Sequence, residues 1–184
     1  MVVVVGGHSR KIGKSSVVAG LIRSLRRAEW TAIKVTAHLH DTDSAEAGFV
    51  VHEEESATST DSGRYHAAGA VRSFWISASR GGMESAAQEV RRLAAAARNT
   101  IVESNSILDF IEPDLFLVVI DPTVEDWKDS ARRQLKRADA LVVVRRNQVA
   151  GSGLPLVEDR TQFTVVAPDY ESPDLVALVE QRLN

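Results

Sequence analysis

The first third of the chain alternates between apolar runs and helical periodicity. Four consecutive valines at residues 2–5 form a β-branched run that ends at Gly6 and Gly7, which is typical of a strand buried on both faces. Residues 17–25 then carry apolar side chains at helical spacing with arginines on the opposite side, which predicts an amphipathic helix. Residues 30–35 return to a strand pattern. This order predicts a right-handed crossover unit.

The rest of the chain continues the same alternation. Short apolar runs predict further strands at residues 71–76, 100–102, 115–120, 141–144 and 163–166. Helical patterns predict an Ala-rich helix at residues 87–97, a polar helix between residues 121 and 140, and a closing helix at residues 175–183 with Ser172 as its cap. The sequence therefore predicts a single α/β domain over residues 1–184, a three-layer α/β/α sandwich around a mostly parallel central sheet.

Residues 38–60 interrupt this alternation. The segment is polar and acidic, with three glutamates at 53–55 and a Ser/Thr cluster after them, so we expect a mobile loop that is disordered without ligand. His38 and His40, with Asp41 and Asp43 close behind, could hold a transition metal, because alternate residues of an extended segment share a face. Solvated loop histidines are the alternative, and the sequence leaves both open.

Composition narrows the classes of function. With 184 residues, 44% of them hydrophobic, the chain can bury one substantial core. A formal net charge of -3, with both signs spread along the chain, predicts no nucleic-acid partner. The absence of cysteine excludes disulfides and thiolate chemistry and favours a cytoplasmic location. No stretch approaches the roughly 20 apolar residues of a membrane helix, so we expect a soluble protein without membrane association.

The segment between the first predicted strand and helix has the clearest chemistry. It ends in the Gly-Lys-Ser of a phosphate-binding loop (P-loop), in which main-chain amides and the positive end of a helix hold phosphate oxygens. Lys14 would add a point charge and Ser15 a hydroxyl for Mg²⁺. Five residues separate the two glycines instead of four, and an ordinary turn before an exposed lysine is the alternative. The predicted phosphate-binding residues are Gly7, His8, Ser9, Arg10, Lys11, Ile12, Gly13, Lys14, Ser15 and Ser16.

Two further segments carry a resemblance to known families. The five-residue spacing, followed by a strand that holds a lysine, resembles the branch of P-loop NTPases that contains dethiobiotin synthetase and the cobyric-acid-type amide synthetases. Residues 32–40 read Ala-Ile-Lys-Val-Thr-Ala-His-Leu-His, and residues 61–70 read Asp-Ser-Gly-Arg-Tyr-His-Ala-Ala-Gly-Ala. Together they resemble the molybdopterin-guanine dinucleotide biosynthesis adaptor family MobB. The resemblance covers about the first 80 residues, and beyond them only the order of strands and helices matches.

The resemblance implies roles for three side chains in these segments. Lys34 would reach the phosphates or the ligand being processed, and a salt-bridged surface lysine is the alternative. Asp61 would serve Mg²⁺ directly or through water, and Arg64 would neutralise phosphate charge. Capping and solvating the helix that follows is an equal alternative for both residues.

An acidic residue at the end of a central strand completes the implied site. Glu103 follows the strand at 100–102, where this branch carries an acid facing the phosphates, although the chain continues with Ser104 instead of the usual glycine. Open α/β sheets place ligands at this edge, so Glu103 could hold Mg²⁺ or orient water. Asp121, at the end of the next strand, competes for that role. The predicted catalytic residues are Lys14, Lys34 and Glu103, and the predicted metal ligands are Ser15, Asp61 and Glu103.

Base recognition and assembly stay open at this stage. Asn147 stands after a late strand and could contact a base, but the aspartate that selects guanine in small GTPases is missing after it. GTP and ATP are therefore both candidates, with GTP slightly favoured by the resemblance. The lysine that marks dimeric partitioning ATPases is replaced by Ser9, which leaves a homodimer open.

Three functions remain in competition. The first is Mg²⁺-dependent nucleoside triphosphate binding and slow hydrolysis in a MobB-like role in molybdenum cofactor biosynthesis, with a pterin cofactor and its nucleotidyltransferase as partners. The second is an ATP-dependent ligase that resembles dethiobiotin synthetase. The third is a non-catalytic switch or scaffold whose loop at 38–60 becomes ordered around nucleotide.

Overall fold

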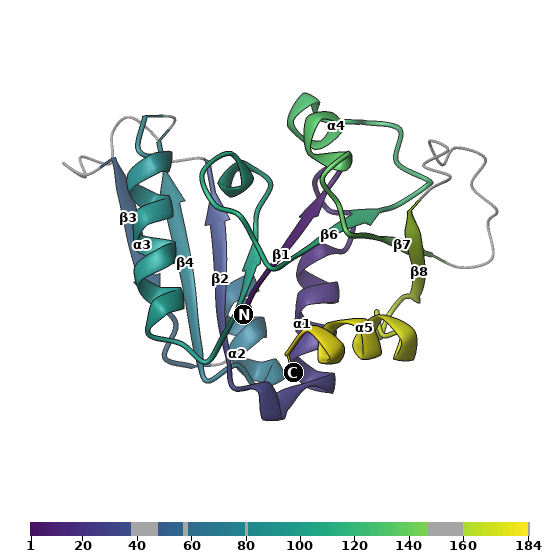
Figure 1. Ribbon diagram of the computed structural model, residues 1–184, viewed down its shortest axis with the longest axis horizontal. Helices are drawn as coiled ribbons and strands as arrows, with labels where there is room; N and C mark the ends of the chain where they lie inside the picture. Colours follow the sequence, from purple (N-terminus) through teal and green to yellow (C-terminus); the bar gives the residue numbers. More distant parts are fainter. Residues whose placement is uncertain (38–47, 57–58, 80, 147–159, 184) are drawn as a thin grey trace.

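The computed structural model describes residues 1–37, 48–56, 59–79, 81–146 and 160–183 (Figure 1). The described residues form eight strands: β1 Val2–Gly7, β2 Trp30–Thr36, β3 Phe49–Glu53, β4 Arg72–Ala78, β5 Asn99–Glu103, β6 Leu115–Ile120, β7 Ala140–Arg145 and β8 Thr161–Val166. They also form five α-helices: α1 Lys14–Ser24, α2 Asp61–Ala68, α3 Met83–Ala95, α4 Asp129–Leu135 and α5 Pro173–Leu183. Short 3-10 helices lie at Arg26–Ala28 and Ser106–Asp109.

The strands make one sheet in the order β3-β4-β2-β5-β1-β6-β7-β8 (Figure 1). Every pair is parallel except β3 with β4, which is antiparallel. The predicted α/β fold with a mostly parallel central sheet is confirmed. The crossover from β1 through α1 does not return to a neighbouring strand, because β5 lies between β1 and β2. The consequence is that the ends of β1, β2 and β5 meet at one edge.

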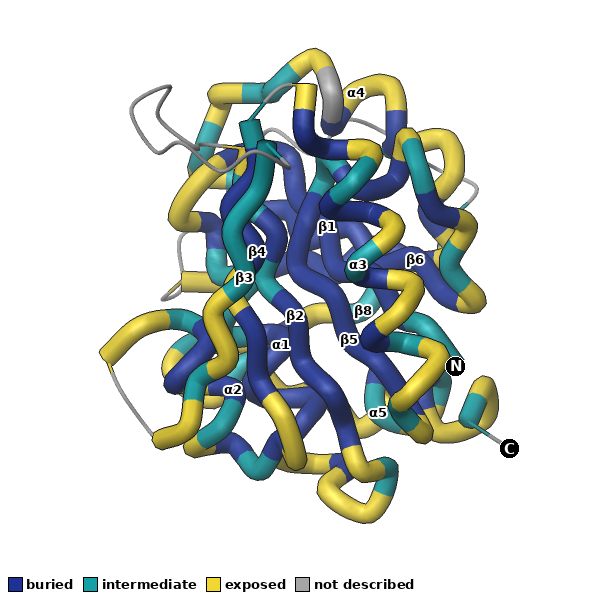
Figure 2. Tube along the Cα trace, turned by 90° about the vertical axis from the view of Figure 1, so that its left-hand side faces the viewer, coloured by how far each residue is buried: buried dark blue, intermediate teal, exposed yellow. Residues whose placement is uncertain are grey.

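Helices cover both faces of the sheet, as the burial pattern of β1 shows. Val3 and Val5 belong to the hydrophobic cluster shared with α1, α2 and α5, whereas Val4 belongs to the cluster shared with α3. All three side chains are fully buried, and Figure 2 shows the central strands as the buried interior of the molecule. The valine run is therefore continuous because each face of this strand meets a different helical layer.

Two local features explain where the elements near the site begin and end. Helix α2 starts after Thr60, whose Oγ1 accepts the amide of Gly63 at 3.0 Å, and it ends at Gly69 with φ 110°. Ser172 caps α5 as predicted, because its Oγ accepts the amide of Leu175 at 3.4 Å. None of the helices in the described part of the chain has the length and apolar content needed to cross a membrane.

Strand β3 is the element that the sequence analysis does not predict. It lies within residues 38–60, where the glutamates favoured a loop, and it pairs along the sheet edge with β4. Glu53 points outward and forms a salt bridge with Arg72, with Oε1 2.6 Å from Nε. A charged residue on an edge strand keeps one side in water, so the acidic run is compatible with pairing. Within the predicted loop, residues 38–47 and 57–58 lie outside the described residues, so the expected mobility there stays a prediction.

Candidate functional site

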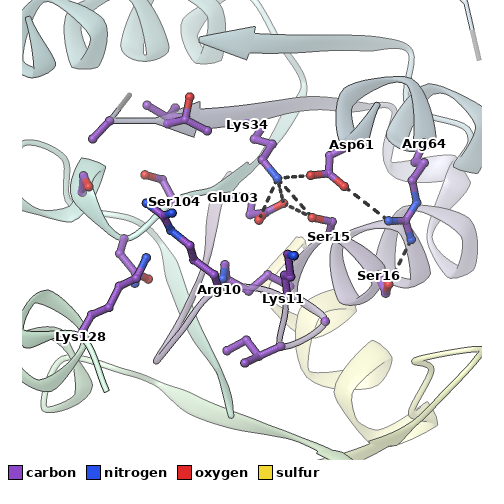
Figure 3. A pocket seen from close by; sticks show the side chains of 18 of the residues that line it. Arg10, Lys11, Ser15, Ser16, Lys34, Asp61, Arg64, Glu103, Ser104 and Lys128 are labelled. Carbon is purple, nitrogen blue, oxygen red and sulfur yellow. Dashed lines mark hydrogen bonds and ion pairs between the residues drawn. The ribbon is translucent and has the colours of Figure 1, made fainter. Parts of the chain in front are cut away.

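A cavity of about 720 Å³ opens at the edge where β1, β2 and β5 end and α1 begins (Figure 3). This is the edge at which open parallel sheets bind ligands. Its wall draws on distant parts of the chain: Arg10, Lys11, Ile12, Gly13, Lys14, Ser15, Ser16, Lys34, Val35, Thr36, Ala37, Asp61, Arg64, Glu103, Ser104, Asn105, Ser106, Lys128, Arg146 and Tyr170.

The first three loop residues, Gly7 to Ser9, lie outside this wall and are bound into the protein. Asn105 clamps Gly7, accepting its amide at Oδ1 (2.7 Å) and donating from Nδ2 to its carbonyl (2.6 Å). The amide of His8 donates to Val119 O at 3.3 Å. The hydroxyl of Ser9 donates to Asp126 Oδ2 at 2.9 Å. The amides of Gly7 and His8 therefore already have partners within the protein, and Arg10 to Ser16 are the loop residues that line the cavity.

His8 is a core residue in this arrangement. Its side chain is fully buried, and its ring lies 4.5 Å from that of Trp127, centroid to centroid. Nε2 lies 3.0 Å from Val124 O, and since a carbonyl only accepts, Nε2 carries the proton. Nδ1 has no hydrogen-bond partner among the described residues. Burial lowers the pKa of His8, so the neutral ring is the form that the fold favours.

The second half of the loop faces the cavity. Lys11 and Gly13 both have positive φ, 58° and 98°, which turns the chain into α1. A Cβ at Gly13 would lie 2.7 Å from the Tyr170 ring, so glycine is required there for space as well as conformation. No side chain caps the first turn of α1, which leaves its amides directed at the cavity edge.

Lys14 is held on the loop itself. Its Nζ donates to the main-chain carbonyl of Ser9 at 2.6 Å, so the ammonium group is already positioned over the turn. Burial lowers the pKa of Lys14 to about 8, and the neighbouring Lys128 and Lys34 act in the same direction against Glu103. Among the residues that the structure describes, the one hydrogen-bond acceptor of Lys14 Nζ is this carbonyl, so the charge of the buried ammonium is incompletely compensated.

The side chains of Ser15, Lys34, Asp61 and Glu103 converge in the cavity (Figure 3). Ser15 Oγ donates to Glu103 Oε2 at 2.7 Å, and Lys34 Nζ lies 3.3 Å from Glu103 Oε1 and 3.4 Å from Ser15 Oγ. Lys34 also forms a short salt bridge with Asp61. Burial acts to raise the pKa of Asp61, but the hydrogen bonds with Lys34 and Ser15 and the charges of Lys34 and Arg64 together hold this pKa below its ordinary value. Lys34, predicted as a site residue, is thus paired inside the site and not on the surface.

Helix α2 contributes three side chains to this cluster. Asp61 meets Lys34, Arg64 donates from NH2 to Ser16 Oγ at 3.1 Å, and the Tyr65 hydroxyl forms a short hydrogen bond to Glu103 Oε2. Thr60, and not Asp61, caps the helix. Burial raises the pKa of Tyr65 well above its ordinary value, so its hydroxyl stays protonated.

The opposite end of the cavity is cationic. Arg146 donates from NH2 to the carbonyl of Lys11 at 2.6 Å, and its Nε lies 2.8 Å from Asp121 Oδ2. Asp121 is buried and does not line the cavity, whereas Glu103 does, so the two competing acids occupy different surroundings. Burial, assisted by the charge of Arg10, lowers the pKa of Lys128.

Three residues predicted from the sequence fall outside the described part of the chain, and two that were not predicted belong to the site. Asn147, His38 and His40 lie outside the described residues, and the described part of the chain has no group of three or more metal-ligating side chains of His, Cys, Asp or Glu. Asn105 and Tyr65 belong to the site although the sequence analysis did not single them out. Both act through hydrogen bonds across distant parts of the chain. For Tyr65 the four-residue spacing from Asp61 on a predicted helix could have given a signal, whereas Asn105 belongs to no motif.

Comparison with known proteins supports the fold. No protein-family model and no curated protein matches the chain. Among solved structures, HypB from Helicobacter pylori in complex with nickel is similar, with a TM-score of 0.58, 13% identity, and coverage of 98% of this chain and 86% of HypB. LpxK from Aquifex aeolicus in complex with ATP is similar, with a TM-score of 0.53 and 16% identity, covering 89% of this chain and 53% of LpxK. At these identities the likeness is one of fold, an α/β domain built around a mostly parallel central sheet.

Proposed function

We propose that this chain binds a nucleoside triphosphate together with Mg²⁺ in the cavity and hydrolyses it slowly. The observation that carries the proposal is the placement of Lys14 and Ser15. They stand at the uncapped start of α1, under a glycine turn, and they line one cavity with Lys34, Asp61 and Glu103. Phosphate groups suit such a site because main-chain amides, a helix start and an ammonium group all favour negative charge.

The charge of the cavity supports a polyanionic ligand. Among the described residues, seven cationic side chains and two carboxylates line it, so its wall is strongly positive although the chain as a whole has a formal net charge of -3. A cleft lined by one sign of charge concentrates ligands of the opposite sign. Lys14, whose burial is poorly compensated, would gain most from phosphate oxygens.

The donor set beside the loop fits Mg²⁺. Ser15, Asp61 and Glu103 offer one hydroxyl and two carboxylates within one hydrogen-bonded cluster, and Mg²⁺ prefers such oxygen ligands. When bound, the ion would neutralise part of the phosphate charge. Lys34, which now compensates both carboxylates, would be released toward the phosphates. Glu103 would orient water for attack, and Arg64 would add positive charge from α2.

The finer role rests on the resemblance to the MobB family in residues 32–40 and 61–70. We propose GTP as the favoured nucleotide over ATP, a pterin cofactor and its nucleotidyltransferase as partners, and a contribution to molybdenum cofactor biosynthesis. Glu103, which would orient the attacking water, is bound by Lys34 and Tyr65, so we expect slow hydrolysis. Slow hydrolysis suits an adaptor. The proposal holds for a monomer and for a homodimer alike.

One contact also favours a second candidate function. Lys34 lies between the P-loop serine and the carboxylates, at the part of the cavity lined by Thr36 and Ala37. An ammonium there could stabilise phosphoryl transfer to a carboxylate or carbamate acceptor, as in an ATP-dependent ligase. ADP release that depends on an added acceptor would favour this function over slow hydrolysis.

Calorimetric titration with GTP and ATP, each with and without Mg²⁺, tests the proposal. Binding should be tighter with Mg²⁺, and Lys14→Ala should lose charge-assisted hydrogen bonds worth about 1.5–3 kcal/mol, roughly ten- to a hundredfold in affinity. Arg27→Ala is the control, because Arg27 is an exposed arginine on the short 3-10 helix that precedes β2. Unchanged triphosphate binding by Lys14→Ala, or no binding by the wild-type chain, would refute the proposal.

A further inference from the structure

Helix α2 presents one face to the site. Asp61, Arg64 and Tyr65 are spaced three and four residues apart, so their side chains project from the same side of the helix. Each reaches a different group: Asp61 pairs with Lys34, Arg64 donates to Ser16, and Tyr65 donates to Glu103. The first two are exposed enough to exchange with a ligand, whereas Tyr65 is fully buried.

The contacts of Glu103 differ in how well they orient its carboxylate. Lys34 Nζ lies 3.3 Å from Oε1 and 3.4 Å from Oε2, so it attracts the group without selecting either oxygen. Tyr65 contacts Oε2 alone, and Oε2 is also the oxygen that accepts from Ser15 Oγ at 2.7 Å. The terminal torsion of a glutamate is soft, so a directional donor on one oxygen decides which way the carboxylate faces.

We propose that Tyr65 is a positioning residue, whose buried hydroxyl holds the Glu103 carboxylate with Oε2 turned toward Ser15 and so keeps the two oxygen donors together for a divalent cation. The inference rests on the proposed function, in which Ser15 and Glu103 share Mg²⁺. A rigid aromatic ring packed in the core suits this task, because its hydroxyl has a fixed place and brings no charge of its own. Tyr65 would not touch the nucleotide.

Tyr65→Phe isolates the hydroxyl, since it keeps the ring and its packing. The matched control is Ser73→Ala, which removes another buried hydroxyl that ties α2 to the sheet by donating to Ser62 O at 2.7 Å. Calorimetry with GTP in excess EDTA should give the same affinity for all three proteins within about twofold. With Mg²⁺, Tyr65→Phe alone should lose roughly five- to tenfold in affinity. An equal loss with and without Mg²⁺ would mean a structural role and overturn the inference.

A second measurement needs no nucleotide. Crystal structures of the wild-type and Tyr65→Phe proteins without ligand should differ at one place, with the 2.7 Å contact between Ser15 Oγ and Glu103 Oε2 lost in the variant. A carboxylate that stays in place in Tyr65→Phe would overturn the inference even if nucleotide binds. If the wild-type chain binds no nucleotide, the proposed function fails, and this structural comparison still decides whether Tyr65 orients Glu103.

Discussion

The two halves of the phosphate-binding loop lie in different surroundings. Residues 7–9 are buried, and their polar groups bond to Asn105, to β6 and to the segment at 121–128 that follows β6. Residues 10–16 line the cavity, and Lys14 and Ser15 there carry the candidate chemistry. A hydrogen bond joins the two halves, because the carbonyl of Ser9 accepts from Lys14 Nζ.

The difference shows that adjacent residues of one sequence motif can have different roles, one structural and one in ligand binding. The first half anchors the turn in the core, and the second half meets the ligand. Anchoring matters because amides hold an anion well only when the backbone that carries them is fixed before binding. Substitutions in the first half should therefore change stability, and substitutions in the second half should change binding.

The largest expected effect comes from removing the buried anchor. His8→Ala should lower the free energy of unfolding by about 2–4 kcal/mol, because it leaves a cavity beside Trp127 and removes the hydrogen bond to Val124 O. Urea denaturation of the ligand-free protein measures the change. His52→Ala is the control, since His52 is an exposed histidine whose ring stacks on Trp75. Wild-type stability for His8→Ala would show that the first half is not an anchor.

The second-largest expected effect is a pH dependence of nucleotide affinity, which tests Lys14 in the second half of the loop, residues 10–16. Burial lowers the pKa of Lys14 to about 8, so raising the pH from about 7 to about 9 removes its proton in the ligand-free protein. A phosphate then meets a neutral amine or must bring a proton with it. Affinity for GTP with Mg²⁺ should fall about tenfold over this range, as followed by calorimetry.

Lys14→Arg provides the control for this pH dependence. An arginine stays charged throughout the range, so whatever affinity the variant has should change little between about pH 7 and about pH 9. The same decline in both proteins would assign the effect to the nucleotide or to another group. A wild-type affinity that does not fall at all would contradict the assignment of Lys14 as the charged phosphate partner.

The fold was predictable from the sequence where one local pattern decides the structure. Val3, Val4 and Val5 of β1 are buried on both faces of the sheet, and the apolar run predicted at 115–120 forms β6 with the same bounds. The edge strand β3 was not predictable in the same way. Its Phe49, Val50 and Val51 are only partly buried, and charged residues follow directly, so its pairing with β4 depends on the tertiary structure.

The candidate site shows the same limit. Lys34 and Glu103 stand at strand ends, and parallel strands bring such ends together, so the sequence could place them near Ser15. Tyr65 and Asn105 act through a hydroxyl and an amide that reach across 38 and 98 positions of sequence. Such contacts depend on how α2 and the end of β5 pack against the loop, and no periodicity encodes that distance.

The smallest effect tests the boundary between the two halves at Ser9. Its hydroxyl donates to Asp126, but the group that holds Lys14 is its main-chain carbonyl, which an alanine keeps. Ser9→Ala should therefore lower the free energy of unfolding by about 1 kcal/mol, as expected for one hydrogen bond to an exposed carboxylate. Affinity for GTP with Mg²⁺ should change less than about twofold. Asp126→Ala should cost about the same stability, and the double variant little more, because both changes break one contact. If Ser9→Ala instead weakens nucleotide binding as strongly as Lys14→Ala does, the Ser9 side chain meets the ligand, and the boundary lies nearer to Gly7.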